Sequence, residues 1–343
     1  MSDAPGRRRL DRGEVTPQVF AALQTGAVLA PAHVAVLALA GPGAVTAMQG
    51  LLTNDVDKPG DGAFVFGALL TPKGMIVVDG WAARPTAGAI TLTVPAEGRE
   101  SALAIFTRSI PPRLARTSER TSDVRVLRLA GPQSLGQAQV AGLPLPDPGH
   151  VVSAEVGGAA CEIARTADGA PFALQITVPV AAADAVQQRC LAAGALAADD
   201  AALECARVLA GWPRLGAEVD DKTIPQEVRF DELAGLSYTK GCYTGQETVA
   251  RLHFRGHVNR QLRGLLFDAD PVPELNDVMQ QDRDVGRVTS VAWVPEPRVA
   301  GGGRWIGLAM LRREVTPGAV VRAAGRDARV VALPFAVPFT APA

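Results

Sequence analysis

The stretch HVAVLALAGPGAVTAMQGLL, residues 33–52, joins a short apolar run to a turn and a helical pattern. The run predicts a buried strand that ends at Gly41-Pro42, because both residue types favour a turn. Apolar residues then recur from Val45 to Leu52 at the spacing of an amphipathic helix. Pro42 suits the first helical turn, since its missing N–H would have no partner there. The stretch therefore predicts a strand–turn–helix unit.

A second stretch, VLRLAGPQSLGQAQV at residues 126–140, repeats this order of apolar run, Ala-Gly-Pro and helical pattern. The repetition predicts two related strand–helix units, as in split βαβ folds. A dinucleotide-binding loop of the Rossmann type is disfavoured, because Thr46 stands where its third glycine would be needed. The apolar stretch 26–45 is interrupted by proline and glycine, whereas a membrane-spanning helix needs about 20 continuous apolar residues.

The remainder of the chain has two different textures. Strands and helices of a mixed α+β region are predicted over 64–70, 75–81, 89–94, 96–110 and 180–193. From Gln261 onward, short apolar runs alternate with Pro and Gly, which predicts a small closed or nearly closed β-barrel. We therefore expect an N-terminal tail at 1–25, an α+β region at 26–258 and a C-terminal β-barrel domain at 259–343.

The composition bounds the class of protein. With 343 residues, of which 48% are hydrophobic, the chain is long enough for two or three folded domains. Lys and Arg total 34 against 35 Asp and Glu, so the net charge of −1 argues against direct binding of nucleic acid or an anionic membrane. The four cysteines show neither the density of a disulfide framework nor Cys-x-x-Cys spacing. This usage predicts a cytoplasmic protein without a structural zinc site.

The stretch KGCYTGQETVARLHFRG, residues 240–256, gives one cysteine an unusual setting. Thr244 and Glu247 fit a capping box, which would place Cys242 just before a helix N-terminus. The helix dipole and the charge of Lys240 would both favour a thiolate. We therefore predict Cys242 as a reactive thiol and Lys240 as its partner in the chemistry.

Simpler interpretations remain for several of these residues. Cys242 could be a small buried apolar residue, which is the interpretation for the other three cysteines. His253 and His257 have the i, i+4 spacing of a metal-ligand pair, but no third ligand is near them, so no metal site is predicted. The four tryptophans could line a ring-stacking cavity or fill the core.

The motif KGCYTGQE, residues 240–247, resembles the signature of the YgfZ folate-binding proteins, which are relatives of the T-protein (aminomethyltransferase) of the glycine cleavage system. The resemblance extends to VARLHFRG and to the upstream RVLAGWPRLGAEVDDKTIPQE, residues 207–227. GPGAVTAMQGLLTNDV, ALLTPKGMIVVD and GRVTSVAW resemble further segments of the family, so the likeness runs from about Val34 onward. It implies an α+β, three-part ring with split βαβ (ferredoxin-like) units, a small C-terminal β-barrel and a central channel for tetrahydrofolate.

The resemblance also implies a set of folate-binding residues. Glu227, in IPQE, resembles the T-protein glutamate that accepts N–H groups from the edge of the pterin. Asp79, at the end of MIVVD, resembles the second aspartate of a paired Asp-Asp that lies near the one-carbon end of the folate. Val78 replaces the first aspartate of that pair. The implied set is completed by Tyr243, Gln246 and Arg251.

Two functions follow from the resemblance. The first is a tetrahydrofolate-binding accessory protein for iron–sulfur cluster assembly or maintenance in cluster enzymes, including tRNA-modifying ones, with Cys242 as a redox or transient-ligand thiol. Its partners would be those iron–sulfur enzymes or the cluster-assembly proteins. The alternative is an aminomethyltransferase that hands a one-carbon unit to tetrahydrofolate, against which the single carboxylate at Asp79 argues. The cysteine motif favours the first function, and the sequence leaves open whether any reaction is catalysed.

Overall fold

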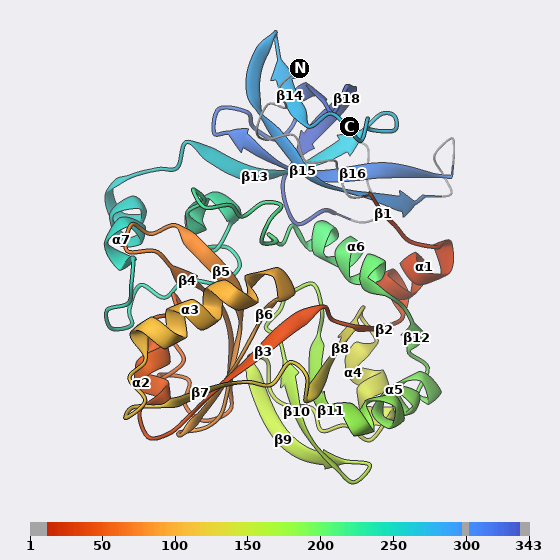
Figure 1. Ribbon diagram of the computed structural model, residues 1–343. Helices are drawn as coiled ribbons and strands as arrows, with labels where there is room; N and C mark the ends of the chain where they lie inside the picture. The colour runs from red at the N-terminus through yellow and green to blue at the C-terminus, as the bar shows by residue number, and fades with distance from the viewer. Residues whose placement is uncertain (1–11, 297–301, 337–343) are drawn as a thin grey trace.

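The computed structural model describes residues 12–296 and 302–336. Within them, an eleven-stranded sheet holds most of the chain up to residue 197, in the order β12-β2-β8-β11-β10-β9-β4-β5-β6-β3-β7 (Figure 1). Its strands are β2 (Val28–Pro31), β3 (Val34–Ala40), β4 (Ala63–Leu70), β5 (Ile76–Thr86), β6 (Ala89–Pro95), β7 (Arg116–Glu119), β8 (Val124–Ala130), β9 (His150–Val156), β10 (Ala159–Arg165), β11 (Leu174–Pro179) and β12 (Leu196–Ala197). Only one register pair, Ala63 with His150, joins β4 to β9, so the sheet has two halves.

The helices lie between and around these strands. They are α1 (Pro17–Thr25), α2 (Ala44–Gln49), α3 (Arg99–Ser109), α4 (Ser134–Val140), α5 (Ala183–Ala192), α6 (Asp200–Ala210) and α7 (Gln246–Arg255), with the 3-10 turns η1 (Ala96–Gly98), η2 (Val180–Ala182) and η3 (Pro225–Val228). Each predicted strand–helix unit is confirmed, as β3 with α2 and as β8 with α4.

The Gly-Pro turns of the two units share one backbone requirement. Gly41 has a φ of 140° and Gly131 a φ of 112°, values that side chains with a Cβ rarely adopt. A Cβ on Gly131 would also lie 2.7 Å from the carbonyl oxygen of Gly26. The repeated Gly-Pro thus marks the same sharp strand-to-helix turn in both units.

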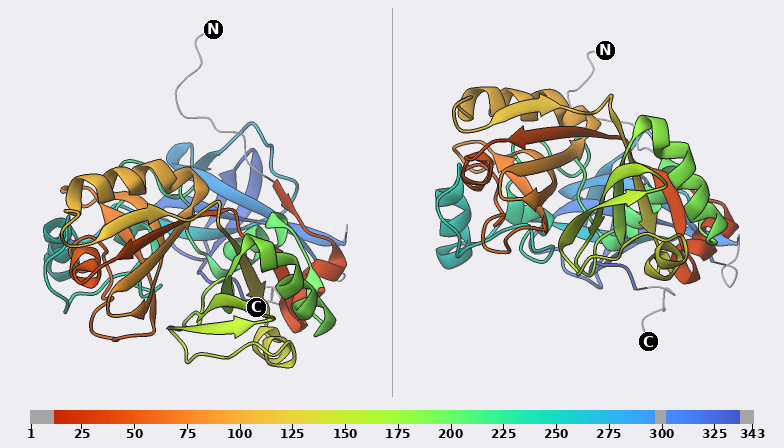
Figure 2. Two further views of the ribbon diagram at one scale, coloured as in Figure 1. Left: turned by 60° about the horizontal axis from the view of Figure 1, so that its bottom comes forward. Right: turned by 90° about the horizontal axis from the view of Figure 1, so that it is seen from below.

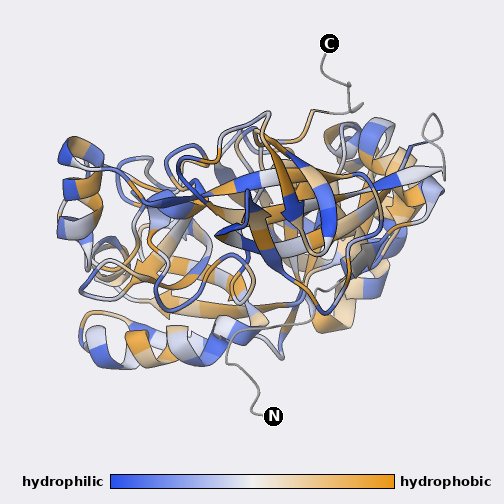
Figure 3. Cartoon of the chain, turned by 90° about the horizontal axis from the view of Figure 1, so that it is seen from above, coloured by the Kyte–Doolittle hydropathy of each residue, from blue (hydrophilic) through white to orange (hydrophobic). Residues whose placement is uncertain are grey.

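Each half of the sheet has its own helical cover. Helices α2 and α3 pack on the half that contains β3 to β7, with Met48 and Phe106 fully buried there. Helices α4 and α5 pack on the other half, around Ala138 and Val186. Seen from below, the two halves lie next to each other in Figure 2. Helices at the periphery alternate hydrophilic and hydrophobic residues, as expected for elements with one face on a sheet (Figure 3).

The C-terminal region forms the predicted small barrel. The seven-stranded sheet has the order β1-β15-β14-β17-β18-β13-β16, and pairing of β15 with β16 closes six of its strands into a ring. The strands are β1 (Arg12–Glu14), β13 (Arg260–Phe267), β14 (Asp277–Gln280), β15 (Arg283–Pro295), β16 (Gly303–Arg312), β17 (Val320–Ala323) and β18 (Arg326–Val331). Alternate apolar residues such as Leu265, Val288 and Leu311 fill its interior.

The segment expected as an N-terminal tail is structured from residue 12 onward. Strand β1 pairs in parallel with β15 of the barrel, with Glu14 opposite Trp293. Helix α1 is capped by Thr16, whose side chain accepts from the N–H of Val19, and it buries Phe20 in the central core. The sequence does not indicate this strand and helix, because three strand residues and one short helix give too little periodicity to detect. Within the described residues, no helix has the length and apolar character needed to cross a membrane.

Candidate functional site

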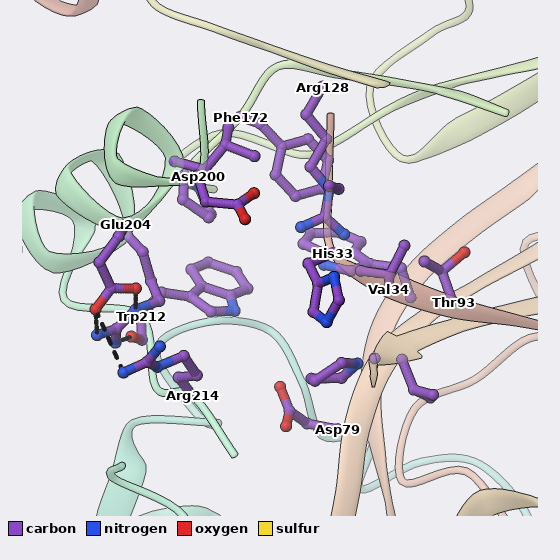
Figure 4. Close-up of a pocket in the computed structure, with 18 of the residues that line it drawn as sticks. His33, Val34, Asp79, Thr93, Arg128, Phe172, Asp200, Glu204, Trp212 and Arg214 are labelled. Atoms are coloured by element: carbon purple, nitrogen blue, oxygen red, sulfur yellow. Dashed lines mark hydrogen bonds and ion pairs between the residues drawn. The ribbon is translucent and has the colours of Figure 1, made fainter. Parts of the chain in front are cut away.

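A cavity of about 450 Å³ is lined by both halves of the large sheet and by α6 with the loop that follows it (Figure 4). Its walls include Asp79 from β5, Arg128 from β8 and Trp212 after α6. Phe172, which precedes β11, is another residue of the lining. The volume falls within the range of pockets that enclose drug-sized ligands, roughly 300–1,000 Å³.

Asp79 contributes a buried carboxyl group to the cavity wall. Its side chain is 5% exposed, and its Oδ1 has no hydrogen-bond partner among the described residues. Burial raises the pKa of this carboxyl from 3.8 to about 7, and the nearby Glu97 adds to the rise. A buried acceptor of this kind is costly unless something donates to it, so the site is suited to a ligand with an N–H or O–H group.

Aromatic rings form a continuous wall of the cavity. Trp81 and Trp212 stack with their ring centroids 5.7 Å apart and an interplanar angle of 15°. Phe172 meets Trp81 edge-on at 5.2 Å, and Phe66 meets Trp212 edge-on at 4.7 Å. Of the four tryptophans considered in the sequence, these two line the cavity, whereas Trp293 and Trp305 pack on each other at 5.6 Å in the barrel region. The wall gives this side of the cavity an apolar, aromatic character.

Arg128 places a cationic side chain in the cavity wall, beside Phe172, as Figure 4 shows. Its Nε and Nη2 donate to Oε1 of Gln175 at 3.2 and 3.0 Å, across the β8–β11 pairing. Its Cζ lies 4.2 Å from the centre of the Phe172 ring. Burial lowers the pKa of this guanidinium to about 10, while the charge of Asp79 opposes that change. The cavity lining therefore carries Asp79 and Arg128 on different walls, with further charged residues on the α6 side.

A buried ion-pair network fixes the α6 side of the cavity. Arg207 donates through Nη2 and Nε to Glu204 at 2.6 and 2.8 Å, and through Nη1 to Glu218 at 3.0 Å. The same guanidinium donates to the carbonyl of Trp212 and to the hydroxyl of Ser290 on β15. The paired carboxylates raise the pKa of Arg207 well above its ordinary value despite its burial. The network thus ties the cavity to the barrel.

Of the residues expected to bind folate, the structure places Asp79 in this cavity and Glu227 elsewhere. Glu227 is buried in η3, and its carboxylate accepts from Nε and Nη2 of Arg260 at 2.8 and 3.1 Å. Its Oε2 also accepts from the backbone N–H of Ile224 at 3.2 Å. Glu227 is not among the residues that line the cavity. The carboxylate expected to meet a pterin edge is thus engaged with strand β13.

The motif at 240–247 folds differently from the expected capping box. Gly245, with a φ of 82°, occupies the N-cap position of α7, and no side chain caps the helix. The N–H of Thr244 donates to the carbonyl of Gly50, and a Cβ on Gly245 would lie 2.6 Å from the carbonyl oxygen of Thr71. The capping-box prediction is therefore wrong, because close packing against neighbouring backbone sets the conformation here.

Lys240 and Cys242 face different environments. The Lys240 ammonium is buried and donates to the carbonyls of Leu52 and Asn54, both at 2.7 Å. Burial lowers its pKa to about 8. Cys242 is exposed, so the simpler interpretation of it as a buried apolar residue is wrong. That interpretation holds for the other three cysteines, Cys161, Cys190 and Cys205, which are buried.

The other predicted folate ligands also lie outside the cavity lining. Tyr243 is buried beneath Lys240, whose Nζ is 5.2 Å from the ring centre, and burial raises the pKa of the phenol to about 12. Gln246 begins α7, and Arg251 is exposed on that helix. His253, considered as a metal ligand, instead stacks on Tyr238 with ring centroids 3.7 Å apart. Sequence reasoning missed Arg128, Phe172 and Arg214, because single residues within ordinary apolar or loop segments give no local pattern.

Comparisons with known proteins give two kinds of relative. The family described as the GCVT N-terminal domain matches this chain over residues 19–237. An aminomethyltransferase of Rubrobacter xylanophilus is 30% identical over 314 residues, which cover 88% of this chain and 81% of that protein. A tRNA-modifying protein YgfZ of Vibrio atlanticus is 37% identical over 79 residues, 23% of this chain and 24% of that protein. Another YgfZ, of Serratia proteamaculans, is 38% identical over 102 residues, and the match spans only 28% of this chain and 29% of that protein.

Among solved structures, the glycine cleavage system aminomethyltransferase T from Bartonella henselae superposes with a TM-score of 0.77. The superposition covers 93% of this chain and 89% of that chain at 18% sequence identity, so it speaks to the fold alone. It confirms the expected T-protein-like α+β architecture with a C-terminal barrel. Together with the family match and the full-length relative, these findings place the chain in the GCVT-domain family of YgfZ and T-protein-like proteins.

Proposed function

We propose that this protein binds tetrahydrofolate in the cavity around Asp79 and acts as a cytoplasmic accessory protein for iron–sulfur cluster enzymes, including tRNA-modifying ones. The observation that carries the folate assignment is the buried Oδ1 of Asp79, which has no hydrogen-bond partner within residues 12–296 and 302–336 and belongs to the lining of an aromatic-walled cavity. A reduced pterin combines an aromatic pyrimidine ring with several N–H donors, so it supplies a donor for Asp79 and a ring that can pack on the aromatic wall.

The residues present fit such a ligand. The Trp81 ring is stacked on Phe64 at 5.0 Å and on Trp212 at 5.7 Å, so it supports the aromatic wall from within. Arg128 with Phe172 offers a cationic and aromatic surface for part of a folate molecule. When bound, tetrahydrofolate would supply nitrogen atoms that can carry a one-carbon unit, and these residues would bind and orient it.

Cys242 is proposed as the residue that serves the partner enzyme. Its thiol is exposed in the loop before α7, where another protein or a cluster can reach it, whereas the remaining cysteines are buried. Burial raises the pKa of Cys205 to about 12 and that of Cys190 to about 11, which keeps both as unreactive thiols. The similarity to tRNA-modifying YgfZ proteins supports the proposed link to tRNA-modifying enzymes.

Calorimetric titration with tetrahydrofolate under anaerobic conditions tests the folate assignment. We expect binding by the unaltered protein and a loss of affinity of about tenfold to hundredfold in Asp79→Asn, the scale of one hydrogen bond to a charged group. Glu162→Gln is the matched control, because Glu162 is another carboxyl whose pKa is raised by burial but does not line this cavity. Equal affinities of the Asp79→Asn and Glu162→Gln variants for tetrahydrofolate would show that the ligand binds outside this cavity.

The second candidate function is aminomethyl transfer, a folate-dependent one-carbon transfer. It is favoured by the 30% identity to an aminomethyltransferase over most of both chains. A carboxyl with a pKa of about 7 is also suited to accept or release a proton near neutral pH. An assay with aminomethyl-loaded lipoyl carrier protein and tetrahydrofolate separates the two functions, since only a transferase releases ammonia and forms methylene-tetrahydrofolate.

A further inference from the structure

Helix α7 carries an exposed aromatic cluster on its last turn. Phe254 is 70% exposed, and in the described part of the chain it is the only aromatic residue among the exposed large hydrophobic side chains. Its ring meets that of His253 edge-on at 4.8 Å, and His253 stacks on Tyr238 at 3.7 Å. The hydroxyl of Tyr238 donates to Oδ1 of Asp231 at 2.5 Å. The exposed ring of Phe254 is therefore supported by rings that are themselves hydrogen-bonded to the protein.

Two arginines flank this ring on the same helix. Arg251 and Arg255 are exposed, and they lie three residues before Phe254 and one residue after it. Residues three and four apart are neighbours on a helix surface, so Arg251 lies next to both of the others. Across the described residues, neither guanidinium forms an ion pair with an acidic side chain. The helix has one acidic residue, Glu247 in its first turn, so its last turns are cationic.

The exposed thiol of Cys242 lies on the same part of the molecule. Only Val249 of α7 is buried, and Figures 1 and 2 show this helix at one edge of the protein. From Cys242 to the helix start the chain can span at most about 14 Å, and the helix rises about 12 Å from Gln246 to Phe254. An interface of ordinary size buries about 800 Å² on each protein, which is about 30 Å across. One partner can therefore contact both the thiol and the aromatic cluster.

We propose that a surface made of Arg251, Phe254, Arg255 and the loop at 241–242, here called the α7 surface, docks a partner protein that combines acidic side chains with an apolar one. This inference rests on the proposed function of Cys242 and adds to it the residues that recognise the partner. Carboxylates pair with guanidinium groups through two parallel hydrogen bonds, and the apolar side chain would cover Phe254. Arginine and large aromatic residues are also the types that contribute most to binding at protein interfaces.

A nucleic acid fits the α7 surface less well than an acidic protein does. A single strand is bound along a cationic groove that follows several phosphates. The next arginine along the chain, Arg260, already pairs with Glu227, so it does not extend the cationic surface. Two guanidinium groups are enough for two carboxylates of a protein, but they are few for a polyphosphate chain, and the net charge of −1 adds no general attraction.

Disulfide exchange at Cys242 measures docking, with three synthetic peptides as probes. Each peptide carries one cysteine as a mixed disulfide with thionitrobenzoate and a test residue about seven positions away, which spans about 25 Å when extended. The first is acidic with leucine as the test residue, the second has serine instead of leucine, and the third has lysines instead of the acidic residues. The Cys242 thiol loses its proton to the buffer, its sulfur attacks that of the peptide cysteine, and the coloured thionitrobenzoate thiolate leaves. The Cys242→Ser protein gives the background from the buried thiols.

The acidic leucine peptide should react about tenfold faster than the lysine peptide at low salt, and the difference should shrink at high salt. It should also react about threefold faster than the serine peptide. Arg251→Ser/Arg255→Ser should remove the first preference, and Phe254→Ser should remove the second. Arg125→Ser/Arg189→Ser is the matched control and should keep both, because it removes two exposed arginines from β8 and α5, in the other half of the large sheet and its cover. Each rate is divided by the rate with iodoacetamide, a small uncharged reagent, to remove changes in the thiol itself.

Equal rates of the unaltered protein with all three peptides would overturn the inference, and this comparison needs no variant. Preferences that persist in the Arg251→Ser/Arg255→Ser and Phe254→Ser proteins would overturn it as well. Tighter binding of a fluorescent single-stranded RNA than of the acidic leucine peptide, measured by anisotropy with the peptide cysteine blocked, would overturn the assignment to a protein partner. Loss of support for iron–sulfur enzymes in Cys242→Ser together with equal peptide rates would leave the proposed function in place without this surface. Full complementation by Cys242→Ser would overturn the proposed function of the thiol and this inference with it.

Discussion

Glu227 and Arg260 form a two-point ion pair that joins η3 to the first barrel strand, with Nε to Oε1 at 2.8 Å and Nη2 to Oε2 at 3.1 Å. A paired arrangement of this kind matches the geometry of guanidinium and carboxylate, and it occupies both oxygens. The Glu227 side chain is 10% exposed and that of Arg260 31%, so the pair lies at the edge of the interior. Glu227 therefore stabilises the junction between the α+β region and the barrel.

Glu227→Gln should lower the free energy of unfolding by about 1–3 kcal/mol, because the neutral amide no longer forms an ion pair with the guanidinium of Arg260. The affinity for tetrahydrofolate should stay within about twofold, since the side chain does not line the cavity. Chemical denaturation and calorimetric titration measure the two quantities. Glu232→Gln serves as control, because Glu232 pairs with Arg229 through a carboxylate that is 57% exposed. A large loss of folate affinity with unchanged stability would support the original expectation of a pterin contact at Glu227.

Asp79→Asn should stabilise the protein at alkaline pH. Because the folded-state pKa of Asp79 is about 7 against an ordinary value of 3.8, the folded state binds a proton that the unfolded state has lost between these values. The stability of the unaltered protein therefore falls as pH rises from about 4 to about 7, and the full cost is present above 7. We expect the variant to gain up to about 4 kcal/mol at pH 8 and nothing at pH 4. Urea denaturation at both pH values checks this, and an equal gain at both would show that ionisation is not the cause.

Cys242→Ser should leave folding and folate binding unchanged while removing support of iron–sulfur enzymes. The residue is exposed, so its replacement creates no cavity in the core. Complementation of a deletion strain measures the functional loss, and full complementation by the serine variant would contradict the proposed role. Alkylation of the native protein should label Cys242 and spare Cys205, which is buried. Cys205→Ser is the control for non-specific effects of removing a thiol.

Arg207→Met should be strongly destabilising. The methionine keeps much of the packing volume but leaves the buried carboxylate of Glu218 without its cation and Glu204 with only the 3.8 Å contact to Arg214. Breaking a buried ion pair on one side costs about 3–5 kcal/mol. Thermal and urea unfolding measure the change, and Arg125→Met on the exposed face of β8 should change stability by less than about 0.5 kcal/mol. A near-neutral effect of Arg207→Met would mean that the two carboxylates are solvated or protonated in the folded protein.

The sequence predicted what depends on local pattern. The strand-to-helix turns at Gly41 and Gly131 were predictable because backbone conformation and apolar periodicity are both written within about fifteen residues. The barrel strands were predictable from short apolar runs between turns. By contrast, Arg128 lies in a strand that reads as VLRL, and only the packing of β8 beside Phe172 brings its charge to the cavity.

The candidate site depended more on tertiary structure than the fold did. Asp79 was expected only from the resemblance of MIVVD to a T-protein segment, and the structure places it in the cavity lining. The ion pair of Glu227 with Arg260 could not be predicted, because Arg260 lies in another part of the fold and no local spacing links the two residues. The capping box predicted at the N-terminus of α7 was wrong for a related reason. The backbone there contacts Gly50 and Thr71, and it is not capped by a side chain of the motif.

The parallel pairing of β1 with β15 has a consequence for synthesis of the protein on the ribosome. Residues 12–14 are made before every strand of the large sheet, whereas their partners at 291–293 are made after all of them. Strand β1 must therefore wait until β15 is made before its backbone groups are paired with that strand. The large sheet can form during translation before this pairing, but the barrel and the first described strand can be completed only together.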